Sequence, residues 1–339
     1  MPMKIKRVLS FVLSASMLLP LLTGCAGKVN TEETKPAATE PAEEAAALKV
    51  LTLGHSLTVD ACHMLNLVAA AEGYNNMLIG TLYYSGCPLS KHVEFLQKDE
   101  AVYDLYLSNS ATPNAPPEST KGVSMKYALN YEYWDVIVLQ GATFELTESA
   151  TYTNGDIQII KDYVNEKKVN PSAVLAWHMP WAIPVDKDLL DTQATGTYTK
   201  RYEQFDHDRS KYFNAMAHCV KEHITTDEDF KILIPTATAY ENVLSSYMEE
   251  KDMHRDYGHA TDIGRLITAY VYFCCVTGVT ELTEIKLNKV PRVFFKTITD
   301  PVDWELSDHE KALILETVNN TLKAPLEMTP SQLTERPAQ

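Results

Sequence analysis

Short apolar runs of strand length alternate along the chain with longer segments whose apolar residues recur at helical spacing. The uninterrupted run of Val136, Ile137 and Val138 is typical of a strand that is covered on both faces. The short runs predict five strands, over residues 49–53, 77–83, 135–139, 174–177 and 231–234. The longer segments predict helices over residues 57–71, 155–167, 199–223, 261–276 and 308–322.

This alternation predicts an α/β fold with three layers, α/β/α, in which a five-stranded parallel sheet lies between two layers of helices. Ligands of such sheets bind outside the carboxyl ends of the strands. Residues with chemistry should therefore follow the strands directly. The first four predicted strands are followed by Ser56, Gly86, Gln140 and His178, and the fifth, one loop further on, by Asp256 and His259.

Both ends of the chain lack this alternation. Residues 1–24 have the plan of a signal peptide, with basic residues ahead of an apolar run that is too short for a stable membrane span. Residues 25–46 are rich in Glu, Thr, Pro and Ala and predict a flexible tether. Residues 327–339 have no apolar stripe and predict a disordered tail. Residues 47–326 remain, and they are long enough for one large domain.

The apolar run ends in Leu22, Thr23, Gly24 and Cys25, which resemble the bacterial lipobox. The resemblance implies cleavage before Cys25 and a diacylglycerol on its sulfur. We therefore expect an extracytoplasmic protein of the cell envelope, anchored to the membrane through Cys25. An ordinary cleaved signal with an incidental cysteine is the alternative.

Charge and cysteine content exclude several classes of protein. The 30 basic and 45 acidic residues give a net charge of −15, which argues against a nucleic-acid partner because phosphate binding needs a basic surface. Of six cysteines, five remain once Cys25 is set aside, and they have neither disulfide nor zinc spacing. Cys274 and Cys275 lie in an apolar helical segment, where packing is their expected role.

Ser56 follows Gly54 at the predicted turn from strand to helix. A serine there is also a common helix N-cap, so the turn alone leaves its role open. Asp256 and His259 change this, because a serine hydroxyl needs a base and a carboxylate can orient that base. An Asp three residues before a His on one loop can reach the imidazole Nδ1, which leaves Nε2 for the serine. The spacing therefore predicts a catalytic triad of Ser56, His259 and Asp256.

These residues resemble the sequence blocks of the SGNH, or GDSL-like, hydrolase superfamily. Residues 51–57 stand where the superfamily has its serine block, and Asp-Tyr-Gly-His at 256–259 matches its Asp-x-x-His block. The likeness is closer to a bacterial lipoprotein branch of unknown function. It implies a flavodoxin-like SGNH fold and an oxyanion hole made by two backbone N–H groups and one amide side chain. Carried over, these donors are Ser56, Gly86 and Gln140.

Two positions depart from the superfamily pattern. Gln140 stands where the usual Gly-x-Asn-Asp block has its asparagine, and the closer branch resembles this chain in having glutamine there. A donor of this kind can contribute about 3 kcal/mol of transition-state stabilisation, so its placement matters. His55 replaces an aspartate that the proton relay does not need, and we expect no catalytic role for it.

His178 ends the fourth predicted strand, beside Trp177 and close to Trp181. Aromatic side chains at the rim of a crevice suit stacking on a sugar ring, which makes these three residues candidates for substrate binding. Ordinary packing in the core suits them equally. Both interpretations stay open.

A metal site is the alternative use of the histidines near residue 256, because His254, Asp256 and His259 are closely spaced. Zinc hydrolases usually place paired histidines four residues apart on a helix. Gly258 and the loop context disfavour a helix at this place. We therefore expect neither a metal nor an organic cofactor.

The triad predicts a serine hydrolase that cleaves an ester through an acyl-enzyme. An exported lipoprotein meets acylated polysaccharide, so the expected substrate is a small-molecule or polysaccharide ester, first of all an O-acetyl group on a carbohydrate. The competing hypothesis is a non-catalytic surface lipoprotein that binds glycans on the same fold, because fold alone does not name a function. The oligomeric state is not indicated.

Overall fold

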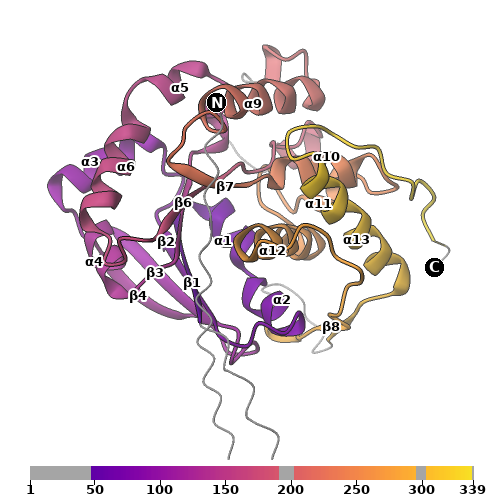
Figure 1. Ribbon diagram of the computed structural model, residues 1–339. Helices are drawn as coiled ribbons and strands as arrows, with labels where there is room; N and C mark the ends of the chain where they lie inside the picture. The colour runs from indigo at the N-terminus through magenta and orange to yellow at the C-terminus, as the bar shows by residue number, and fades with distance from the viewer. Residues whose placement is uncertain (1–46, 191–201, 295–302, 338–339) are drawn as a thin grey trace, which may run out of the picture. The chain divides into compact units, whose positions relative to one another are not determined.

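The computed structural model describes residues 47–190, 202–294 and 303–337 (Figure 1). The described residues all belong to one compact unit, Ala45–Gln339. The predicted signal peptide, Cys25 and the predicted tether lie outside the described residues. In the part that is described, every helix is too short or too polar to cross a membrane.

The central sheet has seven strands and not the five that the apolar runs predicted. In chain order they are β1 (Leu48–Gly54), β2 (Met77–Tyr83), β3 (Tyr103–Asn109), β4 (Glu118–Val123), β5 (Val136–Gln140), β6 (Val174–His178) and β7 (Phe230–Ile234). Their spatial order is β4-β3-β2-β1-β5-β6-β7. The five predicted strands form the parallel part, whereas β3 and β4 extend it in antiparallel pairs beyond β2.

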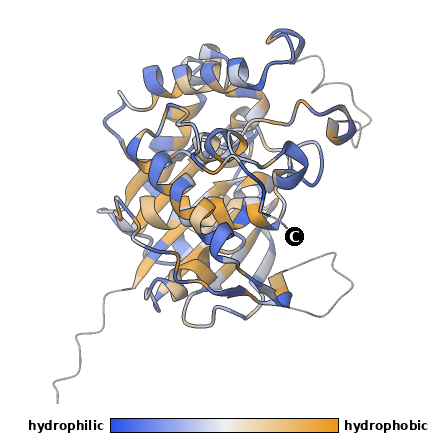
Figure 2. Cartoon of the chain, turned by 90° about the vertical axis from the view of Figure 1, so that its right-hand side faces the viewer, coloured by the Kyte–Doolittle hydropathy of each residue, from blue (hydrophilic) through white to orange (hydrophobic). Residues whose placement is uncertain are grey.

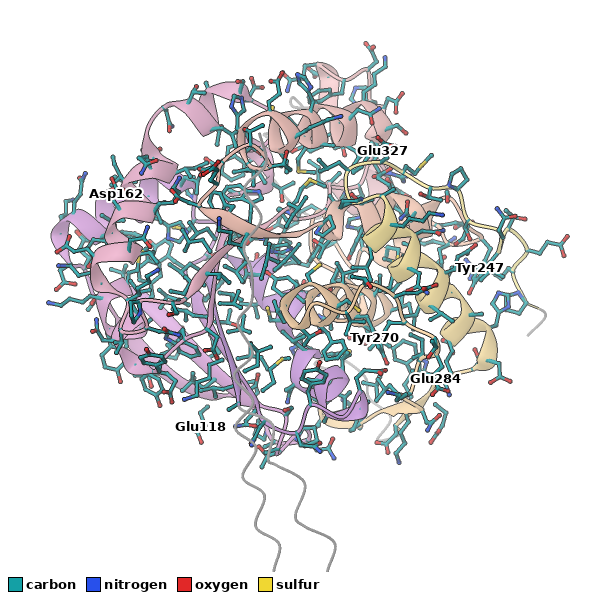
Figure 3. The ribbon with its side chains drawn as sticks, viewed as in Figure 1. Glu118, Asp162, Tyr247, Tyr270, Glu284 and Glu327 are labelled. Carbon is teal, nitrogen blue, oxygen red and sulfur yellow. The ribbon has the colours of Figure 1, made fainter. Side chains whose placement is uncertain are left out.

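The two additional strands have patterns that a search for apolar runs overlooks. In β3 the buried residues Tyr103, Leu105 and Leu107 alternate with half-buried ones, as in a strand that has one face on the core. In β4 every residue except Val123 is exposed, which is typical of an edge strand. Glu118 begins this strand at the edge of the sheet (Figure 3).

Helices cover both faces of the sheet, as the alternation predicted (Figure 1). One layer contains α1 (Ser56–Cys62), α2 (Leu65–Ala71), α10 (Thr236–Leu244), α11 (Glu250–Met253), α12 (Asp262–Thr277) and α13 (Asp308–Lys323). The other contains α3 (Leu89–Lys98), α4 (Met125–Tyr131), α5 (Ser149–Thr153), α6 (Asp156–Lys167) and α9 (Arg209–His223). Short elements complete the described part: η1 (Thr143–Glu145), α7 (Lys187–Leu190), η2 (Arg292–Phe294) and a ladder of β8 (Lys289–Val290) with β9 (Trp304–Glu305).

Hydrophobic side chains fill the space on both sides of the sheet. Successive residues of a strand point to opposite faces, so Val50 packs in the cluster with α12 while Leu51 packs in the cluster with α6 and α9. All five residues of β5 are buried, which explains its continuous apolar run. In Figure 2 the strands are mostly hydrophobic, and hydrophilic positions lie on the outer sides of the helices.

Two predicted helices differ from the observed ones. The predicted helix 57–71 is two helices, since α1 ends at Cys62 and α2 begins at Leu65. Between them, the His63 ring is hydrogen-bonded to Phe294 O (2.8 Å). The predicted helix 199–223 is interrupted: residues 202–203 are helical, a turn follows over residues 204–207, and α9 begins at Arg209. The Asp208 side chain caps α9 by accepting from two backbone N–H groups. Residues 199–201 lie outside the described part.

The predicted disordered tail disagrees with the contacts of residues 328–337. They form no helix or strand, but Thr329 N donates to Asn242 Oδ1 (2.7 Å) and Leu333 O accepts from Tyr247 N (3.1 Å). Tyr247 lies beside this segment (Figure 3), and the Arg336 guanidinium lies 5.5 Å from the centre of its ring. Such bonds between backbone and distant side chains leave no trace in a hydropathy pattern.

Candidate active site

The serine turn joins β1 to α1. Gly54 ends the strand, and an added Cβ there would lie 2.1 Å from Thr58 Oγ1, so the close approach of chain to helix requires glycine. The buried His55 caps α1, with Nδ1 accepting from Leu57 N (3.4 Å). Burial lowers the pKa of His55 to about 4, which keeps its ring neutral. Ser56, the first helical residue, is partly exposed.

The second half of the site is a short loop between α11 and α12. An antiparallel bridge between His254 and Ala260 closes the loop, and Arg255 N donates to His259 O (2.9 Å). Within it, Asp256 Oδ1 accepts from the backbone N–H groups of Gly258 (3.0 Å) and His259 (2.8 Å). Both carboxylate oxygens also lie 2.9 Å from His259 Nδ1.

These contacts determine the charge of the carboxyl group. Burial acts to raise the pKa of Asp256, but the hydrogen bonds from the His259 ring and from the backbone N–H groups together outweigh it and hold the pKa well below its ordinary value. An ionised Asp256 favours the proton on His259 Nδ1, and Nε2 is then free to act as a base. The contact is made at the nitrogen that the spacing predicts.

Ser56 and His259 line one pocket of about 460 Å³. It lies between α1, the loop of His259 and the strands β2 and β3, and Ser119 of β4 also lines it. Among the contacts of the described residues, no hydrogen bond joins Ser56 to His259. Catalytic hydrogen bonds are often longer in unliganded enzymes and tighten when substrate binds, so the two groups stay compatible with a proton relay.

A buried carboxylate fastens the serine helix to the histidine loop. Asp60 stands one helical turn after Ser56, and its side chain is only 4% exposed. It accepts from Arg255 Nη1 (3.0 Å) and from Ala260 N (2.9 Å) on the loop. Arg265 of α12 donates to it through Nε (3.0 Å) and Nη2 (2.8 Å). One side chain therefore joins α1 to a loop and a helix that follow about 200 positions later in the chain.

Asp60 was not predicted to belong to the site, and Arg255 was expected to be a solvent-exposed loop residue. The sequence held a signal, because Asp60 is the one charged residue of α1 and Arg265 lies at the start of a long apolar run in α12. Opposite charges in two apolar helices indicate a buried ion pair, since a charge buried without a partner would be costly. The pattern does not say which two helices meet.

Gln140 lies behind the serine turn and is 1% exposed. Its Oε1 accepts from His55 N (3.5 Å) and from the Thr58 hydroxyl, and its Nε2 lies 2.9 Å from His178 Nδ1. Gln140 is not among the residues that line the pocket. These contacts disagree with the predicted role of oxyanion donor, because the carboxamide is occupied in holding the backbone that precedes Ser56.

His178 does not contact the pocket either, contrary to the substrate-binding interpretation. It is fully buried, and its Nε2 lies 2.7 Å from Thr236 Oγ1, which itself donates to Met179 O (3.0 Å). The Thr236 oxygen must therefore accept from Nε2–H, which leaves Nδ1 to accept from Gln140. Burial holds the pKa of His178 well below its ordinary value, so the ring is neutral and structural.

The two tryptophans that were candidates for substrate binding are also fully buried, which corrects that prediction. Trp177 packs against Phe230 and Tyr152 on the side of the sheet away from α1. Trp181 stacks on Tyr240, with ring centres 4.7 Å apart, and its Nε1 donates to Gly258 O (2.8 Å). Trp181 therefore supports the loop of His259 from behind.

Gly86 lies in an exposed turn after β2, with a φ of 57° that favours glycine. It does not line the pocket.

Within residues 47–190, 202–294 and 303–337, no three His, Cys, Asp or Glu side chains form a group that could hold a metal ion. The buried His254 has no hydrogen-bond partner on either ring nitrogen in the described part, and Cys274 is buried as a free thiol.

Fold and site together define an α/β protein with a mostly parallel sheet, at whose carboxyl edge a serine and an aspartate-paired histidine line one pocket. Residues 49–291 match the model of the family "Domain of unknown function (DUF4886)". The chain belongs to this family. No curated protein matches it.

Solved structures that are similar to this one include the following two. The first is the crystal structure of a DUF4886 family protein from Bacteroides uniformis, with 23% sequence identity and a TM-score of 0.69; the match covers 85% of this chain and 100% of that chain. It shows the shared fold. The second is a protein from Slackia heliotrinireducens that was provisionally assigned to the SGNH hydrolases, with 15% identity and a TM-score of 0.40; the match covers 67% of this chain and 97% of that chain.

Proposed function

We propose that the protein is a serine ester hydrolase of the SGNH type, with Ser56 as nucleophile, His259 as base and Asp256 as the carboxylate that orients the base. The observation that carries the proposal is the pocket shared by Ser56 and His259, together with the Asp256 contact at His259 Nδ1. The spatial order β2-β1-β5-β6-β7 of the parallel strands, which is the flavodoxin-like order, agrees with it.

The reaction proceeds by acyl transfer. As Ser56 Oγ bonds to the ester carbonyl carbon, its proton passes to His259 Nε2. The bond between the carbonyl carbon and the alkoxy oxygen then breaks, and the alcohol leaves with that proton. Water, deprotonated by His259, attacks the acyl-enzyme and releases the carboxylic acid and the free Ser56.

The backbone N–H groups of Ser56 and Gly86 are the proposed donors to the oxyanion. Ser56 begins α1, so its N–H has no partner within the helix. Gly86 has to approach the pocket from the exposed turn after β2, and glycine permits such movement of the backbone. Gln140 contributes by holding the turn, since Oε1 accepts from His55 N.

The proposed substrate is an O-acetyl ester of a carbohydrate, which the protein would meet while it is anchored in the cell envelope. This proposal rests on the lipobox-like residues 22–25 and on the polar hydroxyl side chains of the pocket. Anchoring is tested by expressing the full chain in a bacterium that processes lipoproteins and by determining the mature N-terminus. A mature N-terminus at a lipidated Cys25, together with loss of lipidation in Cys25→Ser, supports the anchor. Any other mature N-terminus overturns it.

A fluorophosphonate probe tests the enzyme proposal, because it reacts covalently with serines that are activated by a base. We expect wild-type protein to be labelled and Ser56→Ala to lose labelling. The midpoint of urea unfolding of Ser56→Ala should equal that of the wild type. Ser119→Ala is the matched control, since Ser119 lines the same pocket from β4 and should keep full labelling.

The competing function is a glycan-binding module that has no activity, and the missing hydrogen bond between Ser56 and His259 in the described part is the observation that favours it. Folded wild-type protein that is not labelled would overturn the enzyme proposal in its favour. Labelling that persists in Ser56→Ala would instead show a different nucleophile.

A further inference from the structure

The antiparallel extension of the sheet forms one wall of the pocket. Thr81 and Tyr83 of β2 and Tyr106 and Ser108 of β3 line it, together with residues of β4. The register places Thr81 opposite Tyr106, and Tyr106 opposite Ser119, so these side chains share one face of the sheet. The wall beside the proposed triad is therefore made of tyrosines and hydroxyl side chains.

The two tyrosines are neighbours on this wall. Their ring centres lie 6.1 Å apart and their planes make an angle of 49°, so the rings form a tilted pair and not a parallel stack. Both side chains are partly exposed. A phenol ring presents an apolar face and a polar hydroxyl, which suits a ligand that has flat apolar faces and a polar edge.

The charges at the pocket are already paired. Asp60 is bonded to Arg255 and Arg265, and Arg255 also donates to the carbonyl of Ala260. The His63 ring bonds to Phe294 O (2.8 Å). Arg255 lines the pocket and Asp60 already balances its charge, which favours a neutral ligand over a phosphate or a carboxylate. A neutral ligand keeps that pair, and a volume of about 460 Å³ holds more than an acetyl group.

We propose that Tyr83 and Tyr106 form a subsite for the saccharide half of the ester, on which one pyranose ring packs while the hydroxyl side chains of Thr81 and Ser108 bond to its edge. The subsite deepens the proposed function and rests on it, because the bound sugar would present its acyl group to Ser56. A pyranose ring has C–H groups on its faces, which can pack on the tyrosines, and hydroxyl groups at its edge, which can bond to the hydroxyl side chains. A long acyl chain would leave these hydroxyl side chains without partners.

The test compares Tyr83→Ala and Tyr106→Ala with the wild type in the full-length protein. The substrate is an acetylated xylooligosaccharide, the measured product is acetate, and the fluorophosphonate labelling rate is measured in parallel. We expect kcat/KM for the oligosaccharide to fall about tenfold, through KM, and to fall by clearly more than the labelling rate. Tenfold corresponds to about 1.4 kcal/mol of binding, which is typical of one aromatic contact.

The matched control is another pair of tilted tyrosines on the protein surface. Tyr127 and Tyr131 of α4 have ring centres 5.9 Å apart at the same angle of 49° and do not line the pocket. Tyr127→Ala should therefore leave both rates unchanged. Tyr106→Phe keeps the ring and should retain most of the oligosaccharide activity, which separates loss of the stacking face from misfolding.

Binding of the same oligosaccharide without acetyl groups, measured by calorimetry, separates failure of the subsite from failure of the enzyme proposal. If wild-type protein is not labelled but binds this oligosaccharide, and Tyr83→Ala and Tyr106→Ala weaken binding about tenfold, the subsite stands without the esterase. If labelled wild-type protein does not bind it, or if the variants bind and cleave like the wild type, the subsite is overturned. An equal loss of labelling and cleavage also overturns it.

Discussion

Replacing Asp60 by asparagine tests how the two halves of the site are held together. The substitution keeps the shape of the side chain and removes its charge. One oxygen becomes an NH₂ group that faces hydrogen-bond donors, because each carboxylate oxygen accepts from at least one arginine: Oδ1 from Arg265 and Oδ2 from Arg255. We expect lower stability and slower fluorophosphonate labelling together.

The magnitude follows from burial. The Asp60 and Arg265 side chains are 4% and 5% exposed, and removing one partner of a buried ion pair costs about 3–5 kcal/mol. Arg265 keeps a second contact, to Asp262 Oδ1 at 3.2 Å, which places the expected loss near the lower end, about 3 kcal/mol. For a domain of this size, that loss lowers Tm by on the order of 10 °C.

Urea unfolding followed by tryptophan fluorescence measures the loss, and Asp262→Asn is the control. Asp262 makes one bond to the same arginine but is 32% exposed, so its substitution should cost less than about 1 kcal/mol. Equal midpoints for Asp60→Asn and Asp262→Asn would refute the reasoning. If Asp60→Asn is destabilised but is labelled at the wild-type rate, the claim that Asp60 holds the two halves of the site together is refuted.

Three further substitutions probe single contacts. Gly54→Ala puts a carbon 2.1 Å from Thr58 Oγ1, so it should abolish labelling or folding, and a normally labelled variant would contradict the geometry of the turn. Trp181→Phe keeps an aromatic ring but loses the bond to Gly258 O; we expect about 1 kcal/mol less stability by urea unfolding and slower labelling. Burial holds the pKa of His254 near 3 against 6.5 in the unfolded chain, so stability falls as the pH drops below about 6.5. His254→Phe should lose less stability between about pH 7 and pH 5 than the wild type, and an equal loss by urea unfolding would contradict this.

The parallel part of the fold could be predicted because its strands contain apolar runs, and β1, β2, β5 and β6 are mostly buried on both faces. The rest of the sheet could not be found in this way, since β4 exposes all its side chains except Val123 and owes its place to pairing with β3. Because β3 and β4 were not predicted, the wall of the pocket that contains Tyr106 and Ser119 was not predicted either. A strand that is stabilised by its neighbour has little local signal of its own.

The local part of the candidate site was also predictable. Asp256 and His259 are three residues apart, and their contact at Nδ1 depends on the geometry of one loop. The roles of Asp60 and Gln140 depend on partners from distant parts of the chain, such as Ala260 and His178. A pattern along the sequence can say that a buried polar group needs a partner, but it does not name that partner.

The missing hydrogen bond between Ser56 and His259 does not by itself separate the proposed nucleophile from its base. Asp60 stands four residues after Ser56 on the same helix and accepts from Ala260 N, one residue after His259, at 2.9 Å. The backbone positions of both groups are therefore fixed relative to one buried carboxylate. What remains free is rotation about the torsion angle of the partly exposed Ser56, because Asp256 holds the His259 ring at Nδ1. In the proposed enzyme we expect this rotation to turn the hydroxyl toward Nε2 when an ester binds, without disturbing the ion pair that holds the site.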